Sequence, residues 1–473
     1  MSKRIFFIGI GGSGMSGLAQ ITCAQGNFVS GSDRNFDQQR DKEIFTFLQS
    51  RGIKLFPQDG TGIGAEIDEV IISGAIEDNN LDLIKAREFN LPVITRAELL
   101  ARLCNSARGI AVAGTSGKST ITAMAAKVMD EACLDPTVIN GAIISEYKSP
   151  GRLGNVKIGS SHFMLIETDE SDGSLVKFYP EIGILANISK DHKPLPDLIK
   201  IFSMFIENIK NEVILNVECP FSRDLSARIS PERVLTFGFT SESDIRAEEV
   251  TLTASGSTFK VQETFFSLPV PGKHNVANAL AAIALGIKLK IPLGTIRQAL
   301  KMFRGVERRL SLIGETGGIK VFDDFSHNAA KIAAALETLK LMGSSLIVIY
   351  QPHGFGSTKL IREELIGTFN LALRKTDSVI LLDIFYVGGT AEKSISSAEL
   401  VREIYIPQTE NLKDREQVID HVTERAQPGD VVVVMGARDN SLTSLAQKIL
   451  RSLKSKTAFS HEEKKMIFSK EGK

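Results

Sequence analysis

The chain has 473 residues, which is too long for one compact domain because a single hydrophobic core stops growing at about 250–300 residues. Hydrophobic residues make up 43% and charged residues 24%, values that exclude wholesale disorder, a collagen-like repeat and a coiled-coil rod. The 56 Lys and Arg residues balance 56 Asp and Glu residues, so the chain lacks the basic excess with which proteins bind nucleic acid over a broad surface. We expect about two to four globular domains and no nucleic-acid partner.

The cysteines and the apolar runs indicate where the protein works. Cys23, Cys104, Cys133 and Cys219 are scattered without CxxC spacing, which is typical of a reducing compartment rather than of a disulfide framework or a zinc ribbon. No run approaches the roughly 18 consecutive apolar residues that a membrane helix needs. The first apolar run, residues 5–8, leads into glycines instead of a cleavage site. The sequence therefore predicts a cytoplasmic protein without a membrane partner.

A glycine-rich turn follows this first apolar run. Residues 4–8 are typical of a strand, Gly9 to Gly14 fit the GxGxxG pattern, and a helical pattern continues to about Ala24. Such glycines let backbone N–H groups and a helix N-terminus approach a diphosphate. Asp33 lies 19 residues after Gly14, where an acidic ribose-binding residue would be expected. The pattern alone is compatible with a dinucleotide, with another diphosphate nucleotide such as a UDP-sugar, or with a packing turn that binds nothing.

Strand and helix patterns alternate along the rest of the chain, which favours α/β domains with parallel, doubly wound sheets. We expect three consecutive α/β domains over residues 1–107, 108–312 and 313–455, and a frayed, lysine-rich tail over 456–473. One helical segment is expected over residues 360–373. Strands are expected at residues 29–33, 69–73, 92–94, 109–113, 163–166, 182–188, 345–350, 378–382 and 430–435.

A second glycine cluster resembles a phosphate-binding loop. It lies between an apolar run, residues 109–113, and an alanine-rich helical pattern, residues 121–129. Backbone N–H groups of such a loop cradle phosphates, a lysine neutralises them, and a hydroxyl can ligate Mg²⁺. It has the shortened form GTxGK[ST], and the alternative is a glycine turn with an exposed lysine. The loop residues are Gly114, Thr115, Ser116, Gly117, Lys118, Ser119 and Thr120.

Polar clusters follow the next two expected strands. Glu167 and three further carboxylates come directly after the run 163–166, and His192 follows the run 182–188. Consecutive strand ends of a parallel sheet converge on one edge, where carboxylates beside a triphosphate suit Mg²⁺. A solvated acidic loop and a surface histidine are the alternatives.

Three later segments carry groups suited to a nucleotide. Asn275 and Asn278 are three residues apart in a helical pattern, so their amides share one face. The pair Arg308-Arg309 could stabilise charge on a transferred phosphoryl group. Residues 322–328 place further carboxylates and a histidine at a strand end. Helix capping by Asn275 and plain charge pairing at a hinge are the alternatives.

In combination, these motifs resemble the Mur ligases, a family of ATP-dependent amide ligases of peptidoglycan precursor synthesis. The resemblance extends from Gly9 to about Gly436 and is greatest to the member that joins UDP-N-acetylmuramate to L-alanine. It implies a Rossmann-like UDP-substrate domain, a central ATPase domain and a C-terminal Rossmann-like domain. The motifs are GIGGSGMSGLA, VSGSD, ISGAI, TRAELL, GTSGKST, ETDESDGS, NISKDH, GKHNVANALAA, GVERRL, DDFSHN, YQPH, LLDI and PGDVVVVMGA.

The resemblance also implies roles for individual residues, with ATP and Mg²⁺ as cofactors and a UDP-N-acetylmuramate-type nucleotide sugar and an amino acid as partners of a monomer or homodimer. The nucleotide sugar is assigned to Gly11, Gly12, Ser13, Gly14, Met15, Ser16 and Asp33, and the substrates further to Phe325, His327 and His353. ATP is assigned to the phosphate loop with His274, Asn275, Asn278, Arg309 and Asp324, and magnesium to Ser119, Glu167 and His192. Catalysis is assigned to Lys118, His192 and Arg309. The carboxylate would be activated as an acyl phosphate, which the amino group of the acceptor attacks.

The chain departs from the alanine-adding member at several positions. That member usually has histidine where this chain has Ser116, His-Pro where it has residues 328–329, and Ala-Gly-Glu where it has residues 387–389. Two arginines that help to receive the amino acid are replaced by Gly354 and Ser357. The alternatives are therefore a paralogous ligase with another amino acid, peptide or carboxylate substrate, and a non-catalytic nucleotide-binding regulator.

Overall fold

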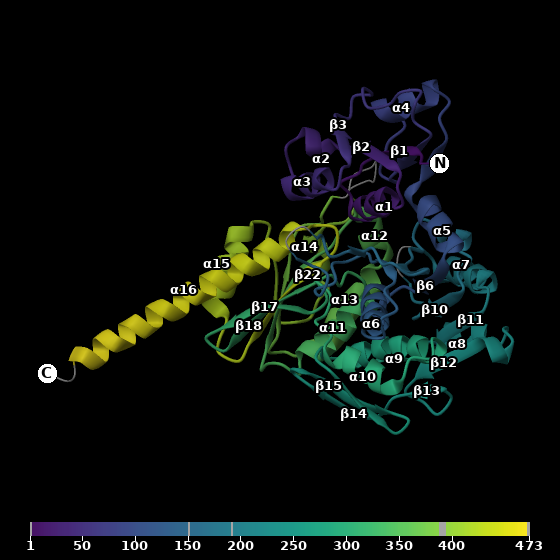
Figure 1. Cartoon of the computed structure of the whole chain (residues 1–473). Coiled ribbons are helices and arrows are strands. Elements are labelled where there is room, and N and C mark those ends of the chain that lie inside the picture. The colour runs from purple at the N-terminus through teal and green to yellow at the C-terminus, as the bar shows by residue number, and fades with distance from the viewer. Residues whose placement is uncertain (1, 150–151, 191–192, 387–393, 471–473) are drawn as a thin grey trace. The chain divides into compact units, whose positions relative to one another are not determined.

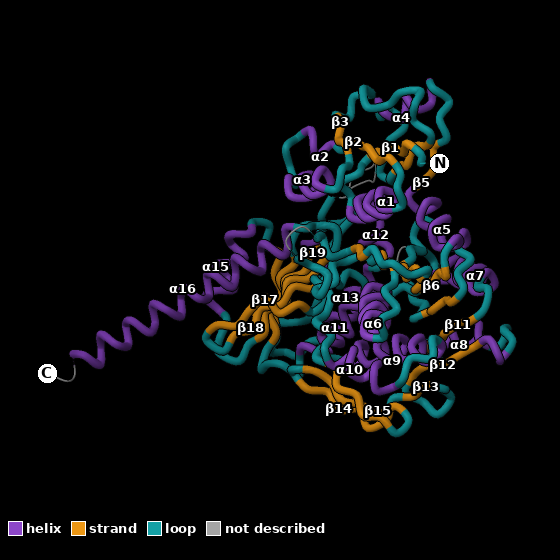
Figure 2. Tube along the Cα trace, viewed as in Figure 1, coloured by secondary structure: helices purple, strands orange, loops and turns teal. Residues whose placement is uncertain are grey.

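A computed structural model describes residues 2–149, 152–190, 193–386 and 394–470 of the chain (Figure 1). The chain forms two compact units. The first consists of Met1–Glu249, Phe259–Ser267 and Ala277–Arg304, and the second of Val250–Thr258, Leu268–Val276 and Gly305–Lys473. Strands gather into sheets that helices cover, as Figure 2 shows, so the expected mixed α/β architecture is confirmed.

The first unit begins with a five-stranded sheet in the order β3-β2-β1-β4-β5. Its paired strands are all parallel, so their carboxyl ends lie at one edge, where the loops after β1, β2, β4 and β5 meet. The strands are β1 (Arg4–Ile8), β2 (Phe28–Ser32), β3 (Lys54–Phe56), β4 (Glu69–Ile72) and β5 (Val93–Thr95). The helices are α1 (Ser13–Ala24), α2 (Arg34–Asp37), α3 (Lys42–Ser50), α4 (Leu81–Glu88) and α5 (Arg96–Ser106).

An eight-stranded sheet follows, in the order β13-β12-β11-β10-β6-β9-β7-β8. Its central strands β10, β6 and β9 are parallel, and only the pair β7–β8 is recorded as antiparallel. Its strands are β6 (Arg108–Ala113), β7 (Thr137–Ile139), β8 (Val156–Lys157), β9 (Phe163–Glu167), β10 (Ile182–Leu185), β11 (Glu212–Asn216), β12 (Val234–Gly238) and β13 (Ile245–Arg246). Its helices are α6 (Lys118–Glu131), α7 (Leu195–Asn208), α8 (Pro220–Ser226), α9 (Lys273–Lys288) and α10 (Leu293–Lys301), with 3₁₀ turns η1 (Ser174–Lys177) and η2 (Pro231–Arg233).

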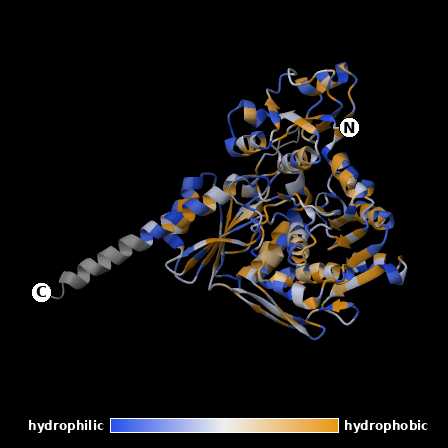
Figure 3. Cartoon of the chain, viewed as in Figure 1, coloured by the Kyte–Doolittle hydropathy of each residue, from blue (hydrophilic) through white to orange (hydrophobic). Residues whose placement is uncertain are grey.

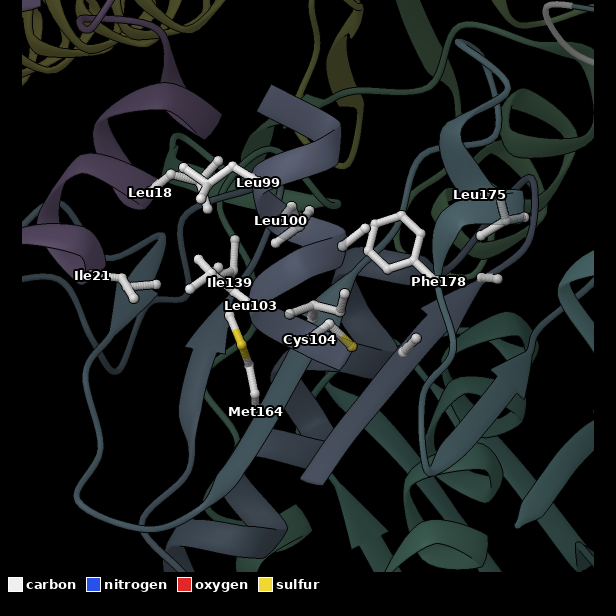
Figure 4. Packing of buried hydrophobic residues seen from close by; sticks show 14 of the residues in the cluster. Leu18, Ile21, Leu99, Leu100, Leu103, Cys104, Ile139, Met164, Leu175 and Phe178 are labelled. Atoms are coloured by element: carbon white, nitrogen blue, oxygen red, sulfur yellow. The ribbon is translucent and has the colours of Figure 1, made fainter. Parts of the chain in front are cut away.

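Helix α5 connects these two sheets through one apolar core. Leu99, Leu100, Leu103 and Cys104 lie on one side of the helix and belong to the same buried cluster as Leu18 of α1 and residues of the eight-stranded sheet (Figure 4). Their spacing of three and four residues places them on a single helical face. Many strands are coloured as hydrophobic, whereas the helices carry both hydrophobic and hydrophilic residues (Figure 3).

The second unit is built on a six-stranded sheet in the order β17-β18-β22-β19-β20-β21. Alternate residues of β22 enter two different cores, since Val433 packs on one face and Val432 on the other. The strands are β17 (Ser311–Thr316), β18 (Ile319–Asp324), β19 (Leu346–Gln351), β20 (Ser378–Leu381), β21 (Gln408–Asn411) and β22 (Val431–Gly436). The helices are α11 (Ala329–Leu339), α12 (Phe355–Leu360), α13 (Arg362–Ala372), α14 (Ser397–Val401), α15 (Arg415–Arg425) and α16 (Ser441–Lys470). A separate three-stranded sheet comprises β14 (Glu248–Thr253), β15 (Gly256–Val261) and β16 (Thr264–Leu268).

Two expected elements differ in the structure. The helix expected over residues 360–373 is present as α13 but begins two residues later, because the chain breaks at Ile361 and Leu360 belongs to the preceding short helix α12. The tail expected to be frayed continues helix α16 as far as Lys470. The helix is anchored where Leu445, Ile449 and Leu453 are buried at helical spacing against the sheet, and the following sequence contains several good helix formers, among them Glu, Lys, Ala and Met.

No helix among the described residues is both long enough and apolar enough to cross a membrane.

Candidate active site

The first glycine loop leaves β1 at the carboxyl edge of the five-stranded sheet. Gly9 has a φ of +81°, a left-handed conformation that favours glycine. The Gly11 N–H donates to Asp33 Oδ2 at 2.8 Å, and the Asn35 N–H donates to Asp33 Oδ1 at 2.8 Å. A side chain on Gly11 would meet the ring of Phe45 at 2.8 Å. Both carboxylate oxygens of Asp33 thus fix the loop, and its contact with a nucleotide sugar stays a prediction.

Helix α1 begins directly after this loop without a side-chain cap. Gly12 is its N-cap residue and makes no capping hydrogen bond, so the first backbone N–H groups of the helix have no partner within it. The side chains of Met15 and Ser16 are 2% and 0% exposed. An anion at this site would therefore meet backbone N–H groups and not these two side chains, and the assignment of Met15 and Ser16 to the nucleotide sugar stays a prediction.

The phosphate loop occupies the corresponding position in the eight-stranded sheet, between β6 and α6. Gly114 and Gly117 have φ values of +132° and +85°, which only glycine adopts without strain. Helix α6 lacks a side-chain cap, so its N-terminus offers N–H groups and a positive dipole end. The Ser116 Oγ is buried and has no hydrogen-bond partner among the described residues. A polar group of this kind is what a bound phosphate would satisfy.

Asn187, which follows β10, clamps the phosphate loop. Its Oδ1 accepts hydrogen bonds from the Thr115 hydroxyl at 2.8 Å and from the Ser116 N–H at 2.9 Å. Its Nδ2 donates to the Ser116 carbonyl at 3.0 Å. The Thr115 hydroxyl also accepts from the Ser189 N–H at 3.0 Å. The Thr115 side chain thus holds the loop together, and at 1% exposed it is not free to face a nucleotide.

The ammonium of Lys118 is held by two acceptors. It donates to the Gly114 carbonyl at 2.6 Å and to the Glu170 carboxylate at 2.7 Å, where the side chains are 14% and 4% exposed. Burial disfavours the charged ammonium, but the negative charges of Glu170 and Glu167 outweigh burial and raise the pKa of Lys118. The lysine is therefore a cation poised at the loop with a carboxylate beside it.

The predicted magnesium ligands are partly within the described residues. Glu167 ends β9 beside Val112 of β6, and one of its oxygens accepts from the Gly141 N–H at 2.7 Å. Ser119 lies in the first turn of α6 and is 3% exposed. His192 lies outside the described residues. No group of three or more His, Cys, Asp or Glu residues that could hold a metal occurs within the part of the chain that the structure describes.

Of the residues assigned to adenine, Asn278 lies against the phosphate loop. A side chain on Gly117 would meet its Oδ1 at 2.5 Å. The side chain of Asn275 points toward the preceding turn, where its Nδ2 donates to the Pro271 carbonyl at 2.7 Å. Burial lowers the pKa of His274, against the opposing charges of Asp324 and Glu337. The i,i+3 spacing thus brings one of the two amides to the loop, while the other fixes the turn before α9.

In the second unit, Arg309 stands on a loop of unusual backbone conformation. Its neighbours Arg308 and Leu310 have φ values of +57° and +49°, which are uncommon for residues with side chains. Asp324 accepts hydrogen bonds from the Leu310 N–H at 2.7 Å and the Ser326 N–H at 2.8 Å. The Arg309 guanidinium lies 4.6 Å from the centre of the Phe325 ring. Asp324 and Phe325 therefore position the arginine, and a ribose contact of Asp324 stays a prediction.

Two imidazoles meet at the carboxyl ends of β18 and β19. The rings of His327 and His353 are 5.3 Å apart, and the residues are 7% and 8% exposed. The His327 Nδ1 lies 3.0 Å from the Phe325 carbonyl, and its Nε2 lies 3.2 Å from Lys331 Nζ. An ammonium can only donate, so Nε2 is the acceptor and Nδ1 carries the proton. The predicted substrate residues of this unit thus form one cluster with a cation.

Comparison with known proteins decides which family has these features. Sequence models match residues 4–108 as "Mur ligase family, catalytic domain", residues 112–286 as "Mur ligase middle domain" and residues 308–438 as "Mur ligase, glutamate ligase domain". The UDP-N-acetylmuramate–L-alanine ligase of Gluconacetobacter diazotrophicus is 36% identical over 94% of this chain and 94% of its own length. The chain belongs to the Mur ligase family. This Mur ligase is also 35% identical to the ligase of the same name from Geobacter sulfurreducens, over 92% of the chain and 95% of that relative.

Solved structures agree with the three-domain architecture of the Mur ligases. The UDP-N-acetylmuramate–alanine ligase of Thermotoga maritima superposes with a TM-score of 0.75 at 26% identity, and covers 96% of this chain and 99% of its own. A murein peptide ligase from Psychrobacter arcticus shares the fold with a TM-score of 0.68 at 23% identity, over 96% and 99% of the two chains. The predicted family and fold class are thus confirmed.

Sequence reasoning did not single out two residues of this Mur ligase site, Asn187 and Glu170. They lie in the motifs NISKDH and ETDESDGS, and their position at strand ends beside the phosphate loop was the available signal. The substitution at residues 387–389 lies outside the described residues.

Proposed function

We propose that this Mur ligase joins the carboxylate of UDP-N-acetylmuramate to L-alanine with hydrolysis of ATP to ADP and phosphate, as a step of peptidoglycan precursor synthesis in the cytoplasm. The main support for this proposal is the match along nearly the whole chain to relatives named for this reaction, at 33–36% identity. We assign the nucleotide sugar to residues 1–107, ATP to residues 108–312 and the amino acid to residues 313–455. The enzyme would act as a monomer or homodimer.

The residues present fit ATP and Mg²⁺. The uncapped start of α6, the buried Ser116 Oγ and the Lys118 ammonium together offer donors to phosphate oxygens. Ser119, Glu167 and His192 are the proposed magnesium ligands, and their hydroxyl, carboxylate and imidazole groups match an ion beside a triphosphate. When bound, Mg²⁺ would neutralise charge on the phosphates. Asn278 and His274 with Asn275 are the proposed adenine contacts, and Asp324 is proposed for the ribose.

The proposed reaction has two steps. An oxygen of the muramyl carboxylate attacks the γ-phosphorus, the bond to ADP breaks, and an acyl phosphate forms. The amino group of the acceptor then attacks the acyl carbon, loses a proton and expels phosphate. Lys118 and Arg309 stabilise charge on the transferred group, and catalysis rests on positioning and on these charges.

The acceptor loop is where this chain differs from the L-alanine ligases. Gly354 has φ and ψ values of +66° and 121°, so its backbone conformation suits glycine and not the arginine found in that member. An arginine bound to a carboxylate contributes about 1.5–3 kcal/mol, so another group must supply this energy for L-alanine. These two positions favour a second candidate, a paralogous ligase with a different amino acid or peptide as acceptor.

Phosphate release tests the proposal. Purified protein is mixed with Mg-ATP and UDP-N-acetylmuramate, and amino acids and short peptides are screened with L-alanine as reference. We expect release with L-alanine and an amide product of the corresponding mass, and no release by Lys118→Ala. Phosphate release with another acceptor only would support the paralogous ligase. No phosphate release with any acceptor would support a non-catalytic nucleotide-binding regulator.

A further inference from the structure

Arg96 begins α5 directly after β5, at the same sheet edge as the first glycine loop. A capping box fixes this first helical turn: the Glu98 N–H donates to Thr95 Oγ1 at 3.2 Å, and the Thr95 N–H donates to Glu98 Oε2 at 2.8 Å. The ammonium of Lys177 lies 2.6 Å from the other oxygen of Glu98, and with the Thr95 hydrogen bonds it lowers the pKa of Glu98 to about 2. The backbone that carries Arg96 is therefore held in place.

The Arg96 side chain lies over the first turn of α1. A side chain on Gly14 would meet Arg96 Cδ and Nη1 at 3.1 Å, so the glycine leaves room for the arginine. Helices α1 and α5 also contact each other, and Figure 1 shows them as neighbours. The guanidinium thus lies beside the backbone N–H groups with which the uncapped helix begins.

Arg96 and Arg102 lie on the same helix but differ in whether a carboxylate pairs with the guanidinium. Arg102 donates two hydrogen bonds to Glu69, at 3.0 and 2.7 Å. Arg96 is half-buried, and the structure records for it no hydrogen bond or ion pair with any of the residues 2–149, 152–190, 193–386 and 394–470. A half-buried guanidinium without a bound acceptor is well placed to receive an anion.

The charge of Arg96 also reaches the acidic segment after β9. Arg96 and Lys118 are both near enough to Asp169 in this segment for their positive charges to act on its carboxylate. Arg96 therefore contributes positive potential between the first glycine loop and the phosphate loop.

We propose that Arg96 binds the diphosphate of the nucleotide sugar, with its two terminal nitrogens donating to phosphate oxygens while the first N–H groups of α1 donate from the other side. A guanidinium presents its donors as a planar fork that matches phosphate, and a lysine ammonium does not. The proposal rests on the proposed function, which places the nucleotide sugar at this sheet. It adds a substrate-binding residue that the motif assignments did not include.

Calorimetric binding of UDP and UMP to the full-length protein tests the proposal without turnover. We expect Arg96→Ala to raise the Kd for UDP at least tenfold and to remove the preference for UDP over UMP, because UMP lacks the second phosphate. Arg96→Lys should raise the Kd for UDP at least threefold, since the point charge of an ammonium replaces the planar donors of the guanidinium. Arg87→Ala is the matched control, because Arg87 is exposed and paired with Asp78 at 2.7 Å. The Kd of a non-hydrolysable ATP analogue should not change in any variant.

The other outcomes overturn the proposal. A UDP Kd within twofold of wild type for Arg96→Ala would show that the arginine does not contact the diphosphate. Equal losses for UDP and UMP with a lowered melting temperature would assign a structural role, and weaker binding of the ATP analogue would assign the residue to the phosphate loop. Failure of the wild type to bind UDP would overturn both this proposal and the proposed donor. Binding of UDP that depends on Arg96, without turnover of UDP-N-acetylmuramate, would overturn the proposed function alone.

Discussion

Replacement of Glu170 by glutamine is expected to tighten nucleotide binding. Glu170 lies 2.7 Å from the Lys118 ammonium in a site where both side chains are largely buried. A phosphate oxygen that binds the same ammonium at a similar distance would lie within about 5 Å of the carboxylate, where two unit negative charges repel by about 3 kcal/mol at an effective dielectric constant near 20. Glutamine keeps an acceptor for the lysine and removes the charge.

We expect Glu170→Gln to lower the Kd of a non-hydrolysable ATP analogue at least tenfold, which corresponds to about 1.4 kcal/mol and is less than the full repulsion. The affinity for ADP should change less if the carboxylate faces the γ-phosphate. Asp172→Asn is the control, since it removes a charge from the same segment, where Asp172 accepts from the Ser174 N–H at 2.9 Å and does not contact Lys118. Calorimetry measures each Kd. An unchanged or raised Kd for Glu170→Gln would refute the view that the carboxylate and the phosphate compete for Lys118.

Three further results are expected. Asn187→Ala removes the hydrogen bonds to Ser116 and should raise the KM for ATP at least tenfold, since each lost bond costs about 1 kcal/mol; steady-state kinetics with an unchanged KM would contradict the clamp. Because burial lowers the pKa of His274, the unfolded state binds more protons, so the free energy of unfolding should fall as the pH drops below about 6.5. Urea unfolding at pH 7.5 and 5.5 should show a smaller fall in the free energy of unfolding for His274→Gln than for the wild type. An equal fall for both proteins would exclude this histidine as a cause. Gly354→Ala should destabilise the protein by about 1–3 kcal/mol because of its positive φ. Gly356→Ala meets open space within helix α12 and should not lower the melting temperature, since alanine is the better helix former; equal falls in melting temperature for the two variants would contradict backbone strain at Gly354.

Local patterns predicted much of the fold because the two glycine loops and the buried strands have local causes. The turn at Gly9 and the left-handed N-cap at Gly117 need glycine whatever surrounds them. Strand β22 is a continuous apolar run because it is buried on both faces. Helix α16 was missed beyond residue 455, since its outer part lacks the apolar periodicity on which the prediction relied.

The partners of the site residues could not be predicted from local patterns. The sequence predicted that Asp33 and Asp324 bind ligands. In the structure, each of these carboxylates also fixes a loop by accepting hydrogen bonds from two backbone N–H groups. Glu170 is 52 residues from Lys118, and Asn187 is 71 residues from Ser116. Contacts at such separations arise from the order of strands in the parallel sheet, which places distant strand ends at one edge.

Transfer of ¹⁸O tests the central claim most directly. UDP-N-acetylmuramate labelled with ¹⁸O in both carboxylate oxygens is incubated with Mg-ATP and the accepted amino acid, and the products are analysed by mass spectrometry. The proposed acyl phosphate predicts one ¹⁸O atom in each phosphate released, one retained in the amide, and one ADP formed for each amide. Unlabelled phosphate, or label found in AMP, would contradict an acyl-phosphate ligase.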